Sequence, residues 1–319
     1  MANKLSAFSK AKRRDTWFYI AIVAIPFFNF CFLQLYQNYI SVFLYSIKAY
    51  DFEQGKYVFQ SDVFANFRTF FREITISPDW KDAFRVSLKG YILSWVVNVP
   101  ISLFVPYYIV RKSLGSNAFK FILMLPSMLS SMIWVLLYNN FVETAWVEMW
   151  GLDFGPLSNK AQQWTAIWIQ GLITGFGANM LLYTGMYSSV SDGVLDAAKI
   201  DGMGVLGEIW YIYFPVLYPV WVVNIVMGIN GLFSGTGPIE YFGNAANEEV
   251  RTIGYILFYK VMYSSRPQDA VVACAGNIVF TLGVLPLVLV AKEVLTHYGP
   301  SEDERKPWFW QKRKGEKLR

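Results

Sequence analysis

The sequence predicts an all-α membrane protein with six transmembrane helices and both the N- and the C-terminus in the cytoplasm. Of its 319 residues, 55% are hydrophobic and only 16% are charged, whereas soluble domains carry about 25% charged residues. Several apolar runs reach the roughly 20 residues that a spanning helix requires. Lys and Arg residues flank these runs, as the positive-inside rule expects. These observations indicate that lipid surrounds most of the chain.

The six predicted spans follow one another with links of different length. They comprise, approximately, residues 17–47, 86–110, 118–141, 164–190, 214–233 and 270–294. The first is much longer than the apolar core of a signal peptide, about 7–15 residues, so we expect it to remain as a span. Its polar side chains indicate that one face meets protein, and they are Asn29, Gln34, Gln37 and Asn38.

Basic residues gather at alternate links, and this pattern gives the expected orientation. Residues 1–16 contain five Lys and Arg residues, the second link carries Arg111, Lys112 and Lys120, and the third link is acidic. The predicted division begins with a cytoplasmic tail at 1–16 and ends with a basic cytoplasmic tail at 296–319. Between them lies a transmembrane domain at 17–295, with outer loops at 48–85 and 234–269 and a cytoplasmic link at 191–213.

The two longer outer loops differ in character. The first contains Phe64, Phe67, Phe70 and Phe71, whose helical spacing predicts an amphipathic helix along the membrane interface. The second contains Gly235, Gly237 and Pro238, which favour irregular structure with some helix.

Residue types that support catalysis or metal binding are scarce. Cys31 and Cys274 lie in separate apolar runs, and the single histidine is His297. This spacing predicts neither a disulfide framework nor a metal site. No G-x-x-x-x-G-K-[ST] segment occurs, so we expect no nucleotide site, no cofactor and no catalytic residue. The net charge of +5 reflects membrane topology, and nucleic acid is not an expected partner.

The cytoplasmic link between the fourth and fifth spans has the most distinctive sequence. Residues 193–201 favour a short helix with Asp192 as N-cap. Ala197 and Ala198 have almost no side chain, so another surface can approach the backbone there. Gly202 would end this helix, since glycine adopts a positive φ easily, and a second helix follows. The residues alone leave two interpretations open: a knob that docks on a partner, or an ordinary amphipathic loop at the membrane surface.

This link resembles the EAA motif, a loop of the membrane subunits of binding-protein-dependent ABC importers. Asp196-Ala197-Ala198 corresponds to EAA, Asp201-Gly202 to its DG pair, and Ile212–Pro219 to its closing I-x-L-P-x-L-x-P segment. Asp196 in place of Glu and Phe214 in place of Leu depart from the pattern but keep its charge or apolar character. The resemblance covers about residues 66–294 and favours carbohydrate importers, of the maltose type or for complex polysaccharide fragments.

The resemblance implies a type I ABC importer fold, multi-pass in a bacterial plasma (inner) membrane. It implies that the link is a coupling helix held in a cleft of a cytoplasmic ATPase, with Pro215 at the entry to the next span. The implied contact residues are Asp196, Ala197, Ala198, Asp201 and Gly202. Expected partners are an ABC ATPase dimer, a second and different permease subunit, an extracytoplasmic solute-binding protein and a carbohydrate cargo.

Sugar recognition favours aromatic faces together with hydroxyl and amide partners. The third and fourth spans offer these candidates: Trp134, Tyr138, Asn139, Trp168, Gln170, Asn179 and Tyr183. Aromatic residues in spans also serve as packing or interface residues, and packing is the alternative for each position.

A stand-alone secondary transporter or channel for a small solute is the alternative function. Such proteins place ionisable residues within their spans, whereas Lys89, Lys292 and Glu293 lie near predicted span ends. A third possibility is a non-transporting membrane scaffold or an intramembrane enzyme. The enzyme fits less well, because the predicted spans contain no His/Glu pair or Ser/Lys dyad. Co-purification with an ATPase would favour the importer, and a stable solitary monomer would favour the alternative.

Overall fold

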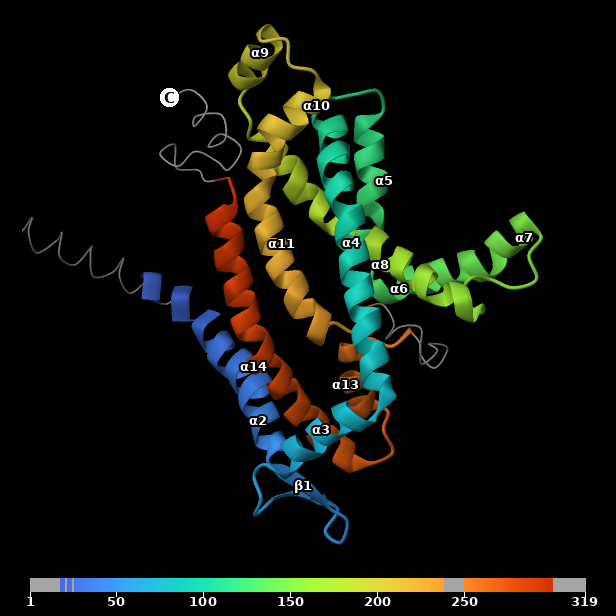
Figure 1. Cartoon of the computed structure of the whole chain (residues 1–319), viewed down its shortest axis with the longest axis vertical. Coiled ribbons are helices and arrows are strands. Elements are labelled where there is room, and N and C mark those ends of the chain that lie inside the picture. Colours follow the sequence, from blue (N-terminus) through green and yellow to red (C-terminus); the bar gives the residue numbers. More distant parts are fainter. Residues whose placement is uncertain (1–17, 21, 25, 238–249, 301–319) are drawn as a thin grey trace, which may run out of the picture. The chain divides into compact units, whose positions relative to one another are not determined.

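Figure 1 shows the computed structural model, which describes residues 18–20, 22–24, 26–237 and 250–300. Its elements fall into two compact units. The first unit comprises residues up to Thr75 together with Lys260–Val279, and the second comprises Ile76–Tyr259 together with the residues from Phe280 onward.

The first unit consists of short elements and parts of two helices. They are η1 (Phe30–Ile40), α2 (Ser41–Ser46), β1 (Lys48–Asp51), β2 (Lys56–Phe59), most of α3 (Ala65–Ile76), and parts of α13 (Ile253–Met262) and α14 (Pro267–Tyr298). The strands pair antiparallel, from Lys48 opposite Phe59 to Asp51 opposite Lys56. In their turn Gly55 has a φ of +63°, which glycine adopts without strain.

A buried asparagine joins these short elements. Asn66 is 2% exposed, and its Nδ2 donates to the carbonyl oxygens of Ser46 at 2.8 Å and Lys48 at 2.7 Å. Its Oδ1 accepts hydrogen bonds from Gln60 at 3.2 Å and from Gln268 at 3.0 Å. Because these four bonds satisfy the buried amide, Asn66 ties the hairpin to α3 and to the first turn of α14.

The region between residues 48 and 85 contains more structure than the sequence predicts. The expected amphipathic helix is present as α3, which includes Phe67, Phe70 and Phe71. The hairpin before it was not predicted, because its strands are four residues long and mostly polar or aromatic. The helix of the second predicted span begins at Pro78 rather than near residue 86, and proline suits a first helical turn.

The second unit is built mainly from long helices. Its elements are α4 (Pro78–Val110), α5 (Ser116–Met128), α6 (Ser131–Asn140), η2 (Phe141–Ala145), α7 (Trp146–Trp150), α8 (Lys160–Ser188), α9 (Asp192–Ile200), α10 (Val205–Glu208), η3 (Ile209–Tyr213), α11 (Phe214–Ser234) and the other parts of α13 and α14. α8 packs against α4 and α5, and α11 packs against α4 and α8 (Figure 1). Met180, Tyr187 and Leu217 form the centre of a core that α4, α8, η3 and α11 share.

Three helices in the described part of the chain are long and apolar enough to cross a membrane: α4, the continuous stretch Val205–Ser234, and α14. Two bent pairs add one span each if each pair counts as a single crossing. They are Ser116–Met128 with Ser131–Trp150, bent by 107°, and Lys160–Gly177 with Asn179–Ser188, bent by 40°. The described residues thus provide three to five candidate spans, and the predicted count of six is not confirmed.

The first predicted span, residues 17–47, begins outside the described residues. Its described part includes an apolar helix, Phe18–Phe32, that is shorter than a full span. The tails at 1–16 and 301–319 and Pro238 of the second outer loop also lie outside the described residues. The orientation of the termini stays a prediction.

The third predicted span, residues 118–141, is broken rather than continuous. Between α5 and α6, Leu129 and Ser130 have extended backbones with ψ angles of 153° and 134°. Pro126 lies in the last turn of α5, where its ring and missing N–H weaken the helix. An apolar pattern alone could not reveal this break, because the residues on both sides of it are apolar or small.

α5 and α8 approach each other closely at Gly177. A Cβ at this position would lie 2.6 Å from the carbonyl oxygen of Leu123, a backbone atom that cannot rotate away. At Gly185 on the same helix, a Cβ would meet no neighbouring side chain or helix within 4 Å among the described residues. Gly177 is therefore required by packing, and Gly185 is not.

We expect Gly177→Ala to lower the free energy of unfolding by about 1–3 kcal/mol, the usual effect of overpacking. Gly185→Ala should leave it unchanged or raise it by up to about 1 kcal/mol, because alanine favours the helix. Thermal unfolding of both purified variants in detergent measures the difference. Equal melting temperatures would contradict the packing role of Gly177.

Candidate functional site

The loop of residues 191–213 joins α8 to α11, and α9 projects beyond the end of α11 (Figure 1). α9 starts at Asp192, and the residue in the N-cap position is Ser191, with φ −70° and ψ 145°. The predicted N-cap, Asp192, is therefore wrong by one position. As the first helical residue, its negative charge still complements the helix dipole.

Gly202 ends α9 with the positive φ that the sequence predicts. Its φ is +74°, its N–H donates to the carbonyl of Lys199 at 3.0 Å, and the N–H of Met203 donates to the carbonyl of Ala198 at 2.9 Å. This pair of bonds is a Schellman motif, which places a left-handed residue directly after the helix. Glycine fits because any Cβ is strained there.

The predicted contact residues do not all face outward. Asp196, Ala197, Asp201 and Gly202 are exposed, and Asp196 pairs with Lys199 at 2.9 Å. Ala198, in contrast, is 6% exposed. A partner could reach the first four, whereas Ala198 packs against the protein itself.

Two apolar side chains on the same loop were not singled out by the sequence. Ile200 is 87% exposed and Leu206 is 71% exposed. Exposed apolar residues that gather on a projecting loop are typical of an interaction surface. Asp201 and Gly202, which lie between them in the sequence, are also exposed.

Pro215 is half-buried in the first turn of α11. A first turn tolerates proline because its N–H groups lack intrahelical partners. The structure thus places Pro215 at the start of a long apolar helix, directly after the π-helix η3, and away from the exposed part of the loop.

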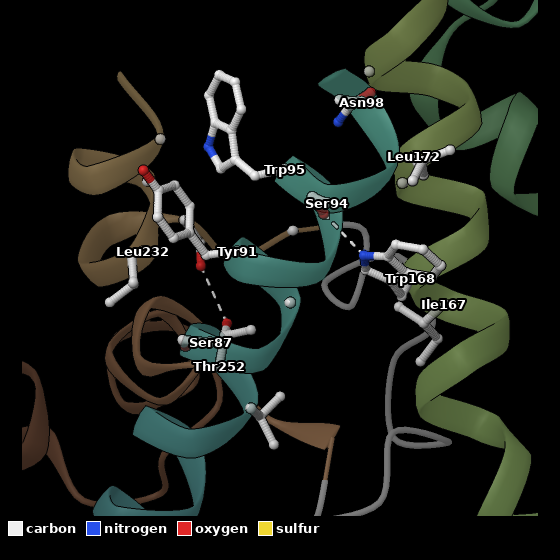
Figure 2. A pocket seen from close by; sticks show the side chains of 18 of the residues that line it. Ser87, Tyr91, Ser94, Trp95, Asn98, Ile167, Trp168, Leu172, Leu232 and Thr252 are labelled. Atoms are coloured by element: carbon white, nitrogen blue, oxygen red, sulfur yellow. Dashed lines mark hydrogen bonds between the residues drawn. The ribbon is translucent and has the colours of Figure 1, made fainter. Parts of the chain in front are cut away.

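A cavity of about 440 Å³ lies among α4, α8 and α11 (Figure 2). Its aromatic lining consists of Tyr91, Trp95, Trp164, Trp168 and Tyr183, and its polar lining consists of Ser87, Ser94, Asn98, Asn179, Asn224 and Thr252. Glycines on all three helices provide room between these side chains. None of the described residues that line the cavity is charged.

Hydrogen bonds and ring stacking hold the cavity walls in place. Trp168 Nε1 donates to Ser94 Oγ at 2.8 Å, as Figure 2 shows. Asn224 Nδ2 donates to the hydroxyl of Tyr183 at 3.1 Å. The rings of Trp164 and Trp168 are parallel within 8°, with centroids 6.0 Å apart. The lining therefore offers an ordered aromatic surface beside amide and hydroxyl groups.

Three of the predicted cargo-binding residues line this cavity: Trp168, Asn179 and Tyr183. Gln170 is on the same helix but is 3% exposed and does not line it. Each residue of an α-helix turns by about 100°, so Gln170 lies on a face far from that of Trp168.

The other three predicted residues, Trp134, Tyr138 and Asn139, lie on α6 and do not line the cavity. The Tyr138 hydroxyl donates to the carbonyl of Ala166 at 2.9 Å, Trp134 is half-buried and Asn139 is exposed. The break before α6 separates this helix in direction from α5, and no sequence pattern indicated that break.

The wall contributed by α4 was missed. Tyr91, Ser94, Trp95 and Asn98 line the cavity, and their spacing of three and four places them on one helix face. This signal is present in the sequence. It is ambiguous there because aromatic residues in an apolar span serve equally well in packing.

The described residues thus combine apolar helices, a cavity whose described lining carries no charge, and an exposed loop in which Gly202 ends α9. Residues 98–300, well over half of the chain, match the family of binding-protein-dependent transport system inner membrane components. The chain belongs to this family, which confirms the resemblance that the EAA-type loop indicated. It is a multi-pass inner-membrane protein of a family of permeases, not of enzymes.

Two curated relatives illustrate the range of the family. The sn-glycerol-3-phosphate transport system permease protein UgpA of Escherichia coli O6:K15:H31 (strain 536) is 25% identical over 183 residues, 54% of this chain and 60% of that protein. The galactooligosaccharides transport system permease protein GanP of Bacillus subtilis (strain 168) is 24% identical over 248 residues, 70% of this chain and 57% of that protein. The aligned region thus spans less than two thirds of each relative.

Solved structures share the fold over most of the chain. A chain of a bacterial ABC transporter involved in the import of the acidic polysaccharide alginate matches with a TM-score of 0.68 and 19% identity, covering 90% of this chain and 97% of that chain. The same kind of transporter in complex with an alginate pentasaccharide-bound periplasmic protein matches with a TM-score of 0.69, covering 88% and 94%. At this identity the likeness establishes the fold.

We expect Gly202→Ala to destabilise the end of α9 by about 1–2 kcal/mol, because alanine is strained at a positive φ. Gly193→Ala is the matched control: it lies in the same helix without a positive φ, and the added methyl would meet no neighbouring described group within 4 Å. Hydrogen exchange of the α9 amides should accelerate only in the first variant. Equal exchange in both would argue against the Schellman cap.

Proposed function

We propose that this chain is the transmembrane permease subunit of an ATP-driven ABC importer, which moves an oligosaccharide or related carbohydrate by alternating access. The observation that carries the proposal is the exposed loop of residues 191–213, with α9 closed by the left-handed Gly202. Membership in a family of binding-protein-dependent transport components supplies the context.

The exposed side of the loop would dock in a cleft of a cytoplasmic ATPase. Its contact surface would comprise Asp196, Ala197, Asp201 and Gly202, extended by the exposed Ile200 and Leu206. Ala198 would support this surface from behind through its packing. The small residues allow close backbone approach, and the apolar ones gain stability when a partner covers them.

ATP hydrolysis would take place in the partner, because this sequence contains no phosphate-binding G-x-x-x-x-G-K-[ST] segment. The complete importer would contain an ATPase dimer, a second and different permease subunit, and an extracytoplasmic solute-binding protein. The alginate transporter solved with its periplasmic protein is a precedent for the last partner. In this arrangement the loop and both tails lie in the cytoplasm, and the fold is of type I with six spans.

Closure of the two ATPases would draw the loops of the two permeases together. The loop continues through α10 and η3 into α11, which forms one wall of the cavity. A movement of the loop would therefore reorient that wall and change the side to which the cavity opens.

The cavity favours a polyhydroxyl cargo. Trp168 and Trp164 present a stacked aromatic surface, and Asn179, Tyr183 and Asn224 offer amide and hydroxyl groups. The names of the relatives refer to galactooligosaccharides, to alginate and to glycerol-3-phosphate, which supports carbohydrate or a related polyol compound.

The alternative is a secondary transporter or channel that acts alone. Ion-coupled transporters place ionisable groups at their central sites, whereas the described lining of this cavity has none.

Cross-linking tests the docking. With Cys31 and Cys274 replaced by serine, Ala197→Cys in the assembled transporter should form a short cross-link to the ATPase, because Ala197 lies on the exposed side of α9. Asn117→Cys, exposed near the start of α5, is the control and should react with a maleimide without cross-linking. A chain that purifies and transports as a solitary monomer would refute the importer and support the alternative.

Trp168→Ala tests the cargo site. Loss of its ring from the cavity should raise the half-saturating cargo concentration for uptake by about tenfold, equivalent to about 1.4 kcal/mol. Trp150→Ala, which alters an exposed residue of α7 outside the cavity, should have no effect. Uptake assays in proteoliposomes measure both, and equal effects would exclude Trp168 from the cargo path.

A further inference from the structure

A buried carboxylate lies at the base of the loop, at a position that the docking surface does not use. Glu208, the last residue of α10, is 4% exposed. It forms an ion pair with Arg111, the residue that follows α4. The hydroxyl of Tyr107, one turn earlier on α4, donates to the same carboxylate at 2.9 Å. An ion pair and a hydrogen bond thus connect the loop to the end of α4.

Aromatic rings extend this junction to α8. The ring of Tyr107 meets the ring of Tyr213 edge-on at 5.7 Å, and Tyr213 stacks on Tyr187 at 4.1 Å with an interplanar angle of 6°. The Tyr187 hydroxyl donates to the carbonyl of Leu103 at 2.7 Å. Glu208, Arg111 and these three tyrosines therefore connect the loop with two walls of the cavity, α4 and α8.

The ion pair between Glu208 and Arg111 indicates that these residues fix the position of the loop relative to α4. A buried ion pair contributes little net stability compared with an apolar pair of the same volume, whereas its directional bonds restrict the geometry. The hydrogen bond from Arg111 to Glu208 raises the pKa of the guanidinium, as expected for a cation beside a carboxylate. Without Arg111, Glu208 would be a buried charge without a counter-charge, whereas the side chain of Arg111 is 26% exposed.

The junction also contains polar atoms that this arrangement leaves unsatisfied. Within the described residues, Arg111 Nε and the Tyr213 hydroxyl are buried and have no hydrogen-bond partner. Buried polar atoms are nearly always paired. Each of these two atoms can take a further polar partner, either water or a protein group.

We propose that Glu208 and Arg111 form the joint through which the loop moves α4 together with α11. The inference rests on the proposed importer function. Glu208 acts as a positioning residue: it contacts neither the cargo nor the ATPase, and it fixes the direction in which movement of α9 is passed to the helix that carries Tyr91, Trp95 and Asn98.

The test compares transport with ATP hydrolysis in the same proteoliposomes that contain the complete transporter. Glu208→Gln keeps the size of the side chain and removes its charge. The number of cargo molecules imported per ATP hydrolysed should fall by about fivefold or more, the scale of a typical coupling between sites. Asp82→Asn, which breaks an exposed pair with Arg85 elsewhere on α4, should leave this ratio unchanged.

A purely structural role predicts a different result. Loss of folded protein would lower uptake and ATP hydrolysis together and leave their ratio unchanged, and this outcome would overturn the proposal. If Glu208→Gln fails to insert, the double variant Glu208→Gln/Arg111→Gln, which contains no unpaired buried charge, gives the deciding measurement. An unchanged ratio in that variant would also overturn it.

The Ala197→Cys cross-link separates this inference from the proposed function. If the cross-link to the ATPase forms in both the parent and the Glu208→Gln background while the import ratio falls, the joint is supported. If it disappears only in the Glu208→Gln background, Glu208 serves docking and the joint is refuted. If it never forms, the importer proposal itself fails.

Discussion

The packing of Tyr213 between Tyr107 and Tyr187, beside the Glu208–Arg111 pair, is the interaction on which the second unit depends. α9 has nine residues, and isolated helices shorter than about 12–15 residues are marginal in water. The loop therefore obtains its order from the helices below it. Tyrosine rings and the Glu208–Arg111 pair provide that order where α4, α8 and η3 meet.

The same junction connects the loop to the helices that line the cavity. α4 and α8 line the cavity with aromatic rings, and both end at the junction. Small residues complement this arrangement: Gly177 permits the close contact of α5 with α8. The result is an ordered chamber whose described lining contains no charged residue, on helices whose ends are joined to an exposed loop.

The elements of the first unit are held together differently from those of the second unit. The elements of the first unit are short, and the amide of Asn66 replaces a large apolar core by satisfying backbone groups from α2 and the hairpin. Such a polar centre fixes one arrangement because an unsatisfied buried amide is costly. A sequence pattern based on apolar periodicity cannot detect it, and this explains why the hairpin was not predicted.

Local sequence properties were enough to establish that the chain is a helical membrane protein, that a short helix in the link of residues 191–213 ends at Gly202, and that the family is one of importer permeases. These properties are the length of the apolar runs, the ability of Gly202 to adopt a positive φ, and the EAA-type motif, which is a continuous stretch of sequence. Tertiary packing was needed to show that Ala198 faces inward and that the third predicted span breaks after Met128. It was also needed to show that Trp168, Asn179 and Tyr183 line one cavity together with Tyr91 and Asn224. Gln170, on the same helix as Trp168, does not line that cavity. The reason is that each of these depends on which helix faces which, and contacts between residues as far apart as Glu208 and Arg111 leave no signal in either local segment.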